Sequence, residues 1–234
     1  MRYTIGLAMT TLFGLGAVST SSTSRAQETY YPTTLTPAAR TFELQLSGGY
    51  TQGFGNISPN TSINNVSGAG IGLTGALAYR ANPYMSLDFE GQYQDFVAEN
   101  NAASRGVNTN VGITVHGAPA THSDPWLRLG TGWRWVWDIS PVGPNGVVLA
   151  SNTYSGWELG TARIGVDLRS SREFAFAPFA GADLQSFSMK NGSSNGTWQW
   201  GTYIYAGLQA RFDVVSHSAG VAQTEGDGKD KVAW

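Results

Sequence analysis

The feature that most constrains the fold is a two-residue alternation of apolar and polar side chains, which runs through most of the chain from Thr41 onward. It is clear in WLRLGTGWRWVWD, residues 126–138. There, two leucines and three tryptophans fall on one side of an extended chain, and two arginines with two glycines fall on the other. A period of two is that of a β-strand whose faces meet different surroundings. Because no helical periodicity is sustained, the sequence predicts an all-β fold.

Segments with this alternation recur along the chain, and they cover roughly residues 42–54, 66–80, 84–96, 105–116, 126–138, 154–169, 174–187 and 198–212. The sixth segment changes parity between Leu159 and Ala162, which predicts a β-bulge near Gly160. Longer, loop-like connections such as GNISPNTSINN and KNGSSNGT follow the odd-numbered segments, and mostly shorter ones follow the even-numbered segments. This rhythm predicts an antiparallel, up-and-down, eight-stranded barrel over residues 41–213.

The N-terminal segment indicates export. Arg2 precedes the apolar run IGLAMTTLFGLGAV, and a Ser/Thr stretch then ends in Ser24-Arg25-Ala26. This pattern predicts a signal peptide at residues 1–26. The alternative is a membrane-spanning helix, but a run of about 14 residues is shorter than the roughly 20 that a span needs. No other stretch is as long and apolar, so any span in the mature chain must be β. We expect a flexible lead at residues 27–40 and a flexible tail at residues 214–234.

Composition excludes several classes of function. Only 13% of the 234 residues are charged and the formal net charge is -2, which gives no electrostatic reason to expect a nucleic-acid partner. There is no cysteine, so disulfides and thiol chemistry are excluded. A mean hydropathy of -0.18 is not that of a bundle of apolar helices.

The aromatic residues distinguish a membrane barrel from a soluble, lipocalin-like one, which alternation alone cannot do. If odd-numbered strands run upward from the periplasm, six tryptophans meet near the outer rim: Trp133, Trp135, Trp137, Trp157, Trp198 and Trp200. Other aromatic residues meet near the opposite rim: Tyr79, Tyr84, Phe174, Phe176 and Phe212. Two such girdles bracket the hydrocarbon layer in transmembrane barrels. We therefore expect a transmembrane barrel.

The polar faces of the segments carry charges of both signs: Glu43, Arg80, Asp88, Glu90, Arg128, Arg134, Glu158, Arg163, Asp167, Asp183 and Arg211. Opposite charges on one face suit an enclosed interior in which they pair, because each alone would carry a large desolvation cost. The glycines on the same face fit a narrow bore. The alternative is the solvated surface of a soluble sheet.

The last segment contains YAGLQARF, residues 205–212, in which a glycine is followed at alternating positions by apolar residues and a final aromatic residue. This resembles the assembly signal of bacterial outer-membrane barrels. Over residues 41–213 the chain resembles the small eight-stranded barrels of Gram-negative bacteria, the superfamily that includes the OmpA transmembrane domain and OmpX. The resemblance implies a monomer in the cell outer membrane. Its partners would be outer-membrane lipids, lipopolysaccharide and the barrel-assembly machinery, which would recognise the last strand. Only about 20 residues follow the barrel, so a peptidoglycan-anchoring role is not carried over.

Eight strands enclose an interior that side chains just fill. We therefore expect a structural role, or an interaction role carried by the loops. One alternative is a narrow channel for small solutes or ions. A second is a lipid-modifying enzyme, but its candidate bases are few: His116 on a polar face, His122 in a turn and His217 in the tail. These histidines lack the spacing of metal ligands, so we expect neither an enzyme nor a metal or cofactor site.

Overall fold

The computed structural model of the chain describes residues 35–97, 103–139, 145 and 150–214. The predicted signal peptide, and most of the predicted lead and tail, lie outside these residues and stay predictions. Within the described part of the chain, no helix is both long and apolar enough to cross a membrane.

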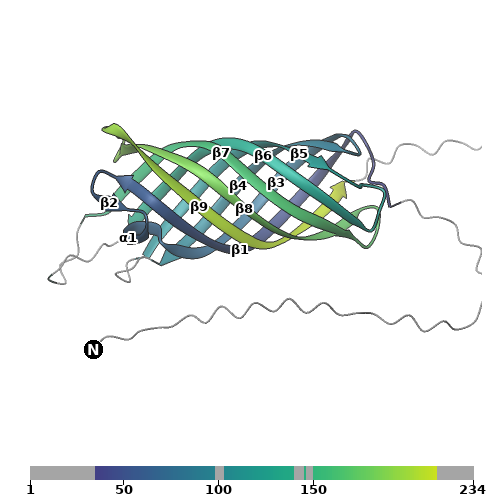
Figure 1. Cartoon of the computed structure of the whole chain (residues 1–234), viewed down its shortest axis with the longest axis horizontal. Helices are drawn as coiled ribbons and strands as arrows, with labels where there is room; N and C mark the ends of the chain where they lie inside the picture. The colour runs from purple at the N-terminus through teal and green to yellow at the C-terminus, as the bar shows by residue number, and fades with distance from the viewer. Residues whose placement is uncertain (1–34, 98–102, 140–144, 146–149, 215–234) are drawn as a thin grey trace, which may run out of the picture. The chain divides into compact units, whose positions relative to one another are not determined.

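The described residues form one barrel of antiparallel strands (Figure 1). Its elements are β1 (Thr41–Ser58), β2 (Thr61–Ser62), α1 (Asn64–Ser67), β3 (Ala69–Asn82), β4 (Met85–Val97), β5 (Ala103–His116), β6 (Ser123–Ile139), β7 (Asn152–Arg169), β8 (Phe174–Lys190) and β9 (Ser193–Val214). Each long strand pairs with the next along the chain, and β9 pairs back onto β1. Leaving out the two-residue β2, eight strands close the barrel, so the predicted fold class is confirmed.

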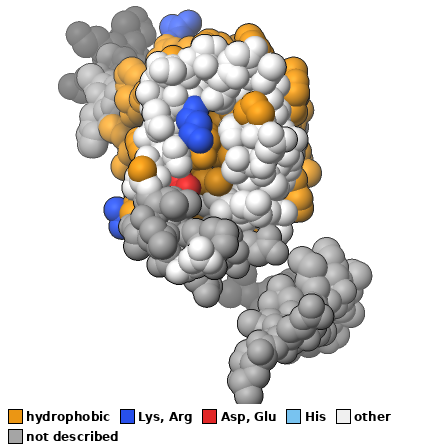
Figure 2. Space-filling model, turned by 90° about the vertical axis from the view of Figure 1, so that its left-hand side faces the viewer, with side chains coloured by type: hydrophobic (Ala, Val, Ile, Leu, Met, Phe, Trp, Pro, Cys, Tyr) orange, Lys and Arg blue, Asp and Glu red, His pale blue; other side chains and the backbone are white. Residues whose placement is uncertain are grey.

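The two faces of the sheet differ in the way that the alternation predicts. On β4, Leu87 and Phe89 are each 58% exposed, whereas Asp88 between them is 3% exposed. Figure 2 looks onto the end that carries α1 and β2, and it shows hydrophobic side chains along the outer edges of the barrel wall. In water so large an apolar surface would be strongly unfavourable, but in a bilayer it is required. Closed barrels with this outer band occupy the bacterial outer membrane, which confirms the predicted location.

The predicted bulge near Gly160 is also confirmed. The pairing of β7 with β8 shifts register between Glu158 and Gly160. As a result, Trp157 before the shift, Leu159 within it and Ile164 after it all lie on the outer face. A bulge inserts one extra residue, so it reconciles two apolar runs of opposite parity within one strand.

The barrel has two distinct ends. We call the end that carries β2, α1 and the β8–β9 hairpin the loop end, and the end where β1 begins and β9 finishes the turn end. One expected loop at the loop end is absent, because KNGSSNGT is instead a hairpin whose two-residue turn is Asn191-Gly192. Both residues have positive φ, 51° and 79°. Asn-Gly favours such turns, and it allows β8 and β9 to extend where the sequence pattern predicted a long connection.

Candidate functional site: the barrel interior

All eleven charged residues that the sequence predicts on the inner face are buried inside the barrel, and none is more than 4% exposed. The structure gathers them into two layers of polar contacts, one near the middle of the bore and one at the turn end. Each layer combines side chains from strands that are far apart in the sequence. The interior is therefore a set of ion pairs rather than a row of separate charges.

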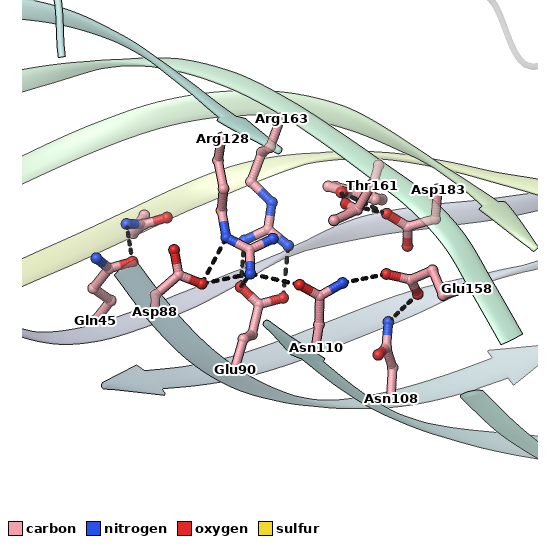
Figure 3. A network of polar contacts seen from close by, with 12 residues as sticks. Gln45, Asp88, Glu90, Asn108, Asn110, Arg128, Glu158, Thr161, Arg163 and Asp183 are labelled. Carbon is pink, nitrogen blue, oxygen red and sulfur yellow. Dashed lines mark hydrogen bonds and ion pairs between the residues drawn. The ribbon is translucent and has the colours of Figure 1, made fainter. Parts of the chain in front are cut away.

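The middle layer is built around Arg163, Arg128 and Arg134, and Figure 3 shows the first two with their partners. Arg163 donates two parallel hydrogen bonds to the carboxylate of Glu90, each 2.8 Å long. Arg128 binds Asp88 through Nε and Nη2 at 2.9 and 2.5 Å, and it also donates to Asn110. Such forked contacts fix the geometry of an arginine and satisfy several buried polar atoms at once. They compensate for the loss of hydration that burial imposes on both charges.

Arg134 occupies the loop-end side of this layer. Its Nη2 lies 2.5 Å from Asp183 and 3.2 Å from Glu158, so one guanidinium serves two carboxylates. Glu158 also accepts hydrogen bonds from Asn108 and Asn110. The amide groups satisfy carboxylate oxygens without adding charge, which allows two acids to share one arginine.

The turn-end layer joins Glu43 with Arg80 and Asp167 with Arg211. The guanidinium of Arg211 also lies over the ring of Trp126, 4.7 Å from its centroid. This layer further contains buried charged residues that sequence reasoning did not select: Asp124, Arg169 and Asp213. They continue the inward parity of their strands and lie at the strand ends, where the alternation is too short to assign a face.

His116 is part of the turn-end layer, and its two ring nitrogens are both engaged. Arg211 donates to Nε2 at 3.1 Å, and Nδ1 lies 2.7 Å from Asp124. Because arginine can only donate, Nε2 accepts and Nδ1 carries the proton of a neutral ring. Ligand atoms of His116, Asp124 and Asp167 lie within 4.8 Å of one another, a spacing that a metal could use. The contact with Arg211 instead indicates a structural role for the histidine. Of the other histidines, His122 lies in an exposed turn and His217 is outside the described residues.

The loop end of the bore is closed by an apolar cluster, which we call the mouth cluster: Ile57, Ile63, Val66, Phe96, Val136, Tyr154, Phe187 and Tyr203. Part of it comes from the stretch GNISPNTSINN, for which the sequence pattern predicts a loop. Instead β1 continues to Ser58, and β2 and α1 turn the chain back, so that Ile63 is fully buried. Gly53 and Gly201 make room for Ile63, because a Cβ atom at either position would overlap its side chain.

Hydrogen bonds hold this closing segment in place. The backbone N–H of Gly53 donates to the carbonyl of Gly68 at 2.8 Å, and that of Ile63 donates to Gly55 at 2.9 Å. The hydroxyls of Ser67 and Tyr203 lie 2.8 Å apart. The ring of Tyr203 also lies 4.2 Å from the guanidinium carbon of Arg134. The mouth cluster is thus joined directly to the ion pairs below it.

The aromatic residues that the sequence predicts at the two membrane interfaces lie on the outer face, except Tyr84, which is exposed in the turn between β3 and β4. On β6 and β7, the ring of Trp133 lies 6.2 Å from that of Trp135 and 6.0 Å from that of Trp157. Near the turn end, the rings of Phe174 and Phe212 are 5.2 Å apart. The remaining predicted interface residues are at least partly exposed: Trp137, Trp198, Trp200, Tyr79, Tyr84 and Phe176. Their anchoring role at the headgroups stays a prediction.

Comparison with known proteins gives likenesses in fold alone. No family model and no curated protein sequence matches this chain. Neisserial surface protein A is 12% identical, with a TM-score of 0.48, and the match covers 72% of this chain and 95% of that one. The N-terminal β-barrel domain of Pseudomonas aeruginosa OprF is 14% identical, with a TM-score of 0.43, and the match covers 75% of this chain and 98% of that domain. Ail of Yersinia pestis is 14% identical, with a TM-score of 0.43, and the match covers 74% of this chain and 99% of that one. The chain is similar to these small outer-membrane barrels in having a closed, antiparallel barrel of eight long strands.

Proposed function

We propose that this protein is a sealed outer-membrane barrel with a structural or interaction role. Its contacts with partners would be made by the surface that projects from the membrane at the loop end. The observation that carries the proposal is the mouth cluster, which fills the loop end of the bore with apolar side chains above a layer of ion pairs. A solute crossing the barrel would have to displace both. Separating the buried pairs would leave unpaired charges in a low-dielectric interior, which is strongly unfavourable.

One small cavity and the contacts between the interior charges do not favour the narrow-channel alternative. A cavity beside Thr51, Thr74 and Tyr205 has a volume of about 10 Å³. That is about the space of one water molecule, so the cavity is not a path for ions. The charged residues that would line a channel are instead bonded to one another across the bore, as with Arg163 and Glu90.

The surroundings of His116 do not favour the enzyme alternative. Both ring nitrogens of His116 are engaged, by Arg211 and Asp124, on the inner face of the barrel. A lipid substrate would meet the outer face, where apolar and aromatic side chains predominate. General base catalysis needs a group within hydrogen-bond reach of the substrate, and His116 does not provide one.

The hairpin of β8 and β9 favours a role in contacts outside the membrane. β9 has 22 residues and β8 has 17, whereas a tilted transmembrane strand needs only about 9–11. The excess residues form a short ribbon with a register shift between Phe187 and Met189, and its tip pairs Met189 with Ser194 and Lys190 with Ser193 around a tight Asn191-Gly192 turn. A ribbon of this kind offers a partner a surface that is already ordered, which reduces the entropy lost on binding.

Planar-bilayer conductance of the purified full chain tests the seal. We expect no discrete openings from the wild type. Arg134→Ala removes a bore arginine, and Arg172→Ala, at an exposed turn position, is the matched control. Steady openings of the wild type that change with Arg134→Ala and not with Arg172→Ala would replace the sealed barrel with the channel.

A further inference from the structure

The outer wall of the barrel is hollowed at one place within its apolar band. The groove has a volume of about 600 Å³ and crosses β1, β3, β4 and β5. Its outward-facing lining includes Leu46, Leu73, Gly75, Gly91, Tyr93 and Val107. Because this face of the barrel meets lipid, the groove opens toward acyl chains rather than toward water.

Two glycines create the hollow. Gly75 and Gly91 are register partners on β3 and β4, and both lie on the outer face. A Cβ atom on Gly91 would meet nothing within 4 Å, and one on Gly75 would meet only Leu46, at 3.9 Å. Neighbouring side chains therefore do not require glycine here, and the pairing has no register shift at this point. Glycine within a strand weakens it, and it often marks a place where another molecule approaches closely.

A cation lies on the same face of the wall, toward the loop end. Arg105 precedes the groove residues Val107 and Thr109 at alternate positions on β5, so its Cα lies about 13 Å from that of Thr109 along the strand. Its side chain is exposed, and its register partner on β6 is Trp137. Its partner on β4 is Asp95, but no carboxylate among the described residues lies within 4.0 Å of the guanidinium.

We propose that the groove holds an acyl chain of a membrane lipid whose phosphorylated headgroup binds Arg105. The lipid chemistry follows from the two parts of the site: an apolar hollow within the hydrocarbon band, and a guanidinium where the strand leaves that band. Arginine binds phosphate oxygens through paired N–H donors, and a tryptophan beside it suits the headgroup level. The inference rests on the proposed outer-membrane barrel and adds a lipid site to it.

A second copy of the chain is a less suitable occupant. The groove is lined by eleven residues, whereas each side of a stable protein interface contributes about 20–30. A concave hollow suits a flexible chain of methylene groups better than it suits the convex wall of another barrel. The attraction is close van der Waals packing, because lipid is as apolar as the groove itself.

Native mass spectrometry of the full chain, refolded in detergent, tests the site by titration with diphosphoryl lipid A or with diacylglycerol. The double variant Gly75→Leu/Gly91→Leu fills the groove. Its matched control is Ala180→Leu/Ala206→Leu, a directly paired outward position on β8 and β9. Heat-modifiable migration in gels confirms that each variant is folded.

We expect the groove-filling variant to weaken binding of both lipids by about fivefold, because roughly ten van der Waals contacts are lost. The control Ala180→Leu/Ala206→Leu should leave the binding of both lipids unchanged. Arg105→Gln should weaken lipid A binding by about fivefold and leave diacylglycerol binding unchanged, because only lipid A carries phosphate. Its matched control is Arg172→Gln at the turn end.

Equal binding by the groove-filling variant and its alanine control would overturn the acyl-chain site. Equal lipid A binding by Arg105→Gln and Arg172→Gln would overturn the headgroup contact. Neither result bears on the seal, which conductance tests separately, so failure of the lipid site is distinguishable from failure of the proposed function.

Discussion

The Arg163–Glu90 pair gives the sharpest test of how the interior is stabilised. Both side chains are buried, and two parallel hydrogen bonds of 2.8 Å join them. Replacing Arg163 by methionine keeps much of the side-chain volume but leaves Glu90 with Arg128 as its nearest cation, 3.9 Å away. Breaking a buried pair by removing one partner typically costs 3–5 kcal/mol. Because Arg128 remains close, we expect Arg163→Met to lower the free energy of unfolding by about 3 kcal/mol, the lower end of that range.

The double variant Arg163→Met/Glu90→Gln separates pairing from packing. With both charges removed, no uncompensated carboxylate remains, so most of the loss should be recovered, to within about 1.5 kcal/mol of the wild type. Arg172→Met removes an exposed arginine at the turn end and should change stability by less than about 0.5 kcal/mol.

Urea unfolding of the refolded barrel in detergent micelles, followed by tryptophan fluorescence, gives these free energies by linear extrapolation. A loss below about 1 kcal/mol for Arg163→Met would mean that water already solvates Glu90 in the bore. A double variant whose loss equals the sum of the losses of Arg163→Met and Glu90→Gln, each measured alone, would show that the two residues do not interact. Either result would refute an interior held together by paired charges.

Two further predictions concern the loop end, and both are measured by the same unfolding assay. Ile63→Ala should lower the free energy of unfolding by about 2–4 kcal/mol, because it leaves a cavity in the mouth cluster, whereas Asn65→Ala on the exposed side of α1 should have little effect. Equal losses of unfolding free energy in Ile63→Ala and Asn65→Ala would contradict the packing of Ile63 in the mouth cluster. Gly192→Val should cost about 1–2 kcal/mol, because its φ of 79° suits glycine, and Ser193→Val should be nearly neutral.

The strands and their faces could be predicted because the two-residue alternation is a local property of the chain. Even the bulge near Gly160 follows from the parity change between Leu159 and Ala162. The face of each predicted interior charge follows in the same way. The ion-pair partner of each charge cannot be predicted in this way, because parity fixes the side of the sheet and leaves open which residues meet across the bore. Arg163 and Glu90 are 73 positions apart in sequence, and no local pattern relates them.

The mouth cluster was missed for a related reason. Ile57, Ile63 and Val66 are spaced irregularly among polar residues, so they show no period that would distinguish a buried segment from a loop. Their burial depends on the hollow that Gly53 and Gly201 leave, and this hollow exists only once the barrel has closed. The apolar residues within GNISPNTSINN were the available signal. The Asn-Gly pair within KNGSSNGT was the corresponding signal for the β8–β9 turn.

The central claim, that tryptophans of the wall face lipid while the bore is shielded from it, can be tested by fluorescence quenching with brominated phospholipids. Two variants each retain a single tryptophan, with the others replaced by phenylalanine. One keeps Trp133 on the outer face, and the other keeps Trp126, which is 4% exposed and lies beneath Arg211 inside the barrel. We expect bromine near the headgroups to quench Trp133 strongly and Trp126 hardly at all. Equal quenching of the two, or stronger quenching of Trp126, would contradict the assignment of inside and outside.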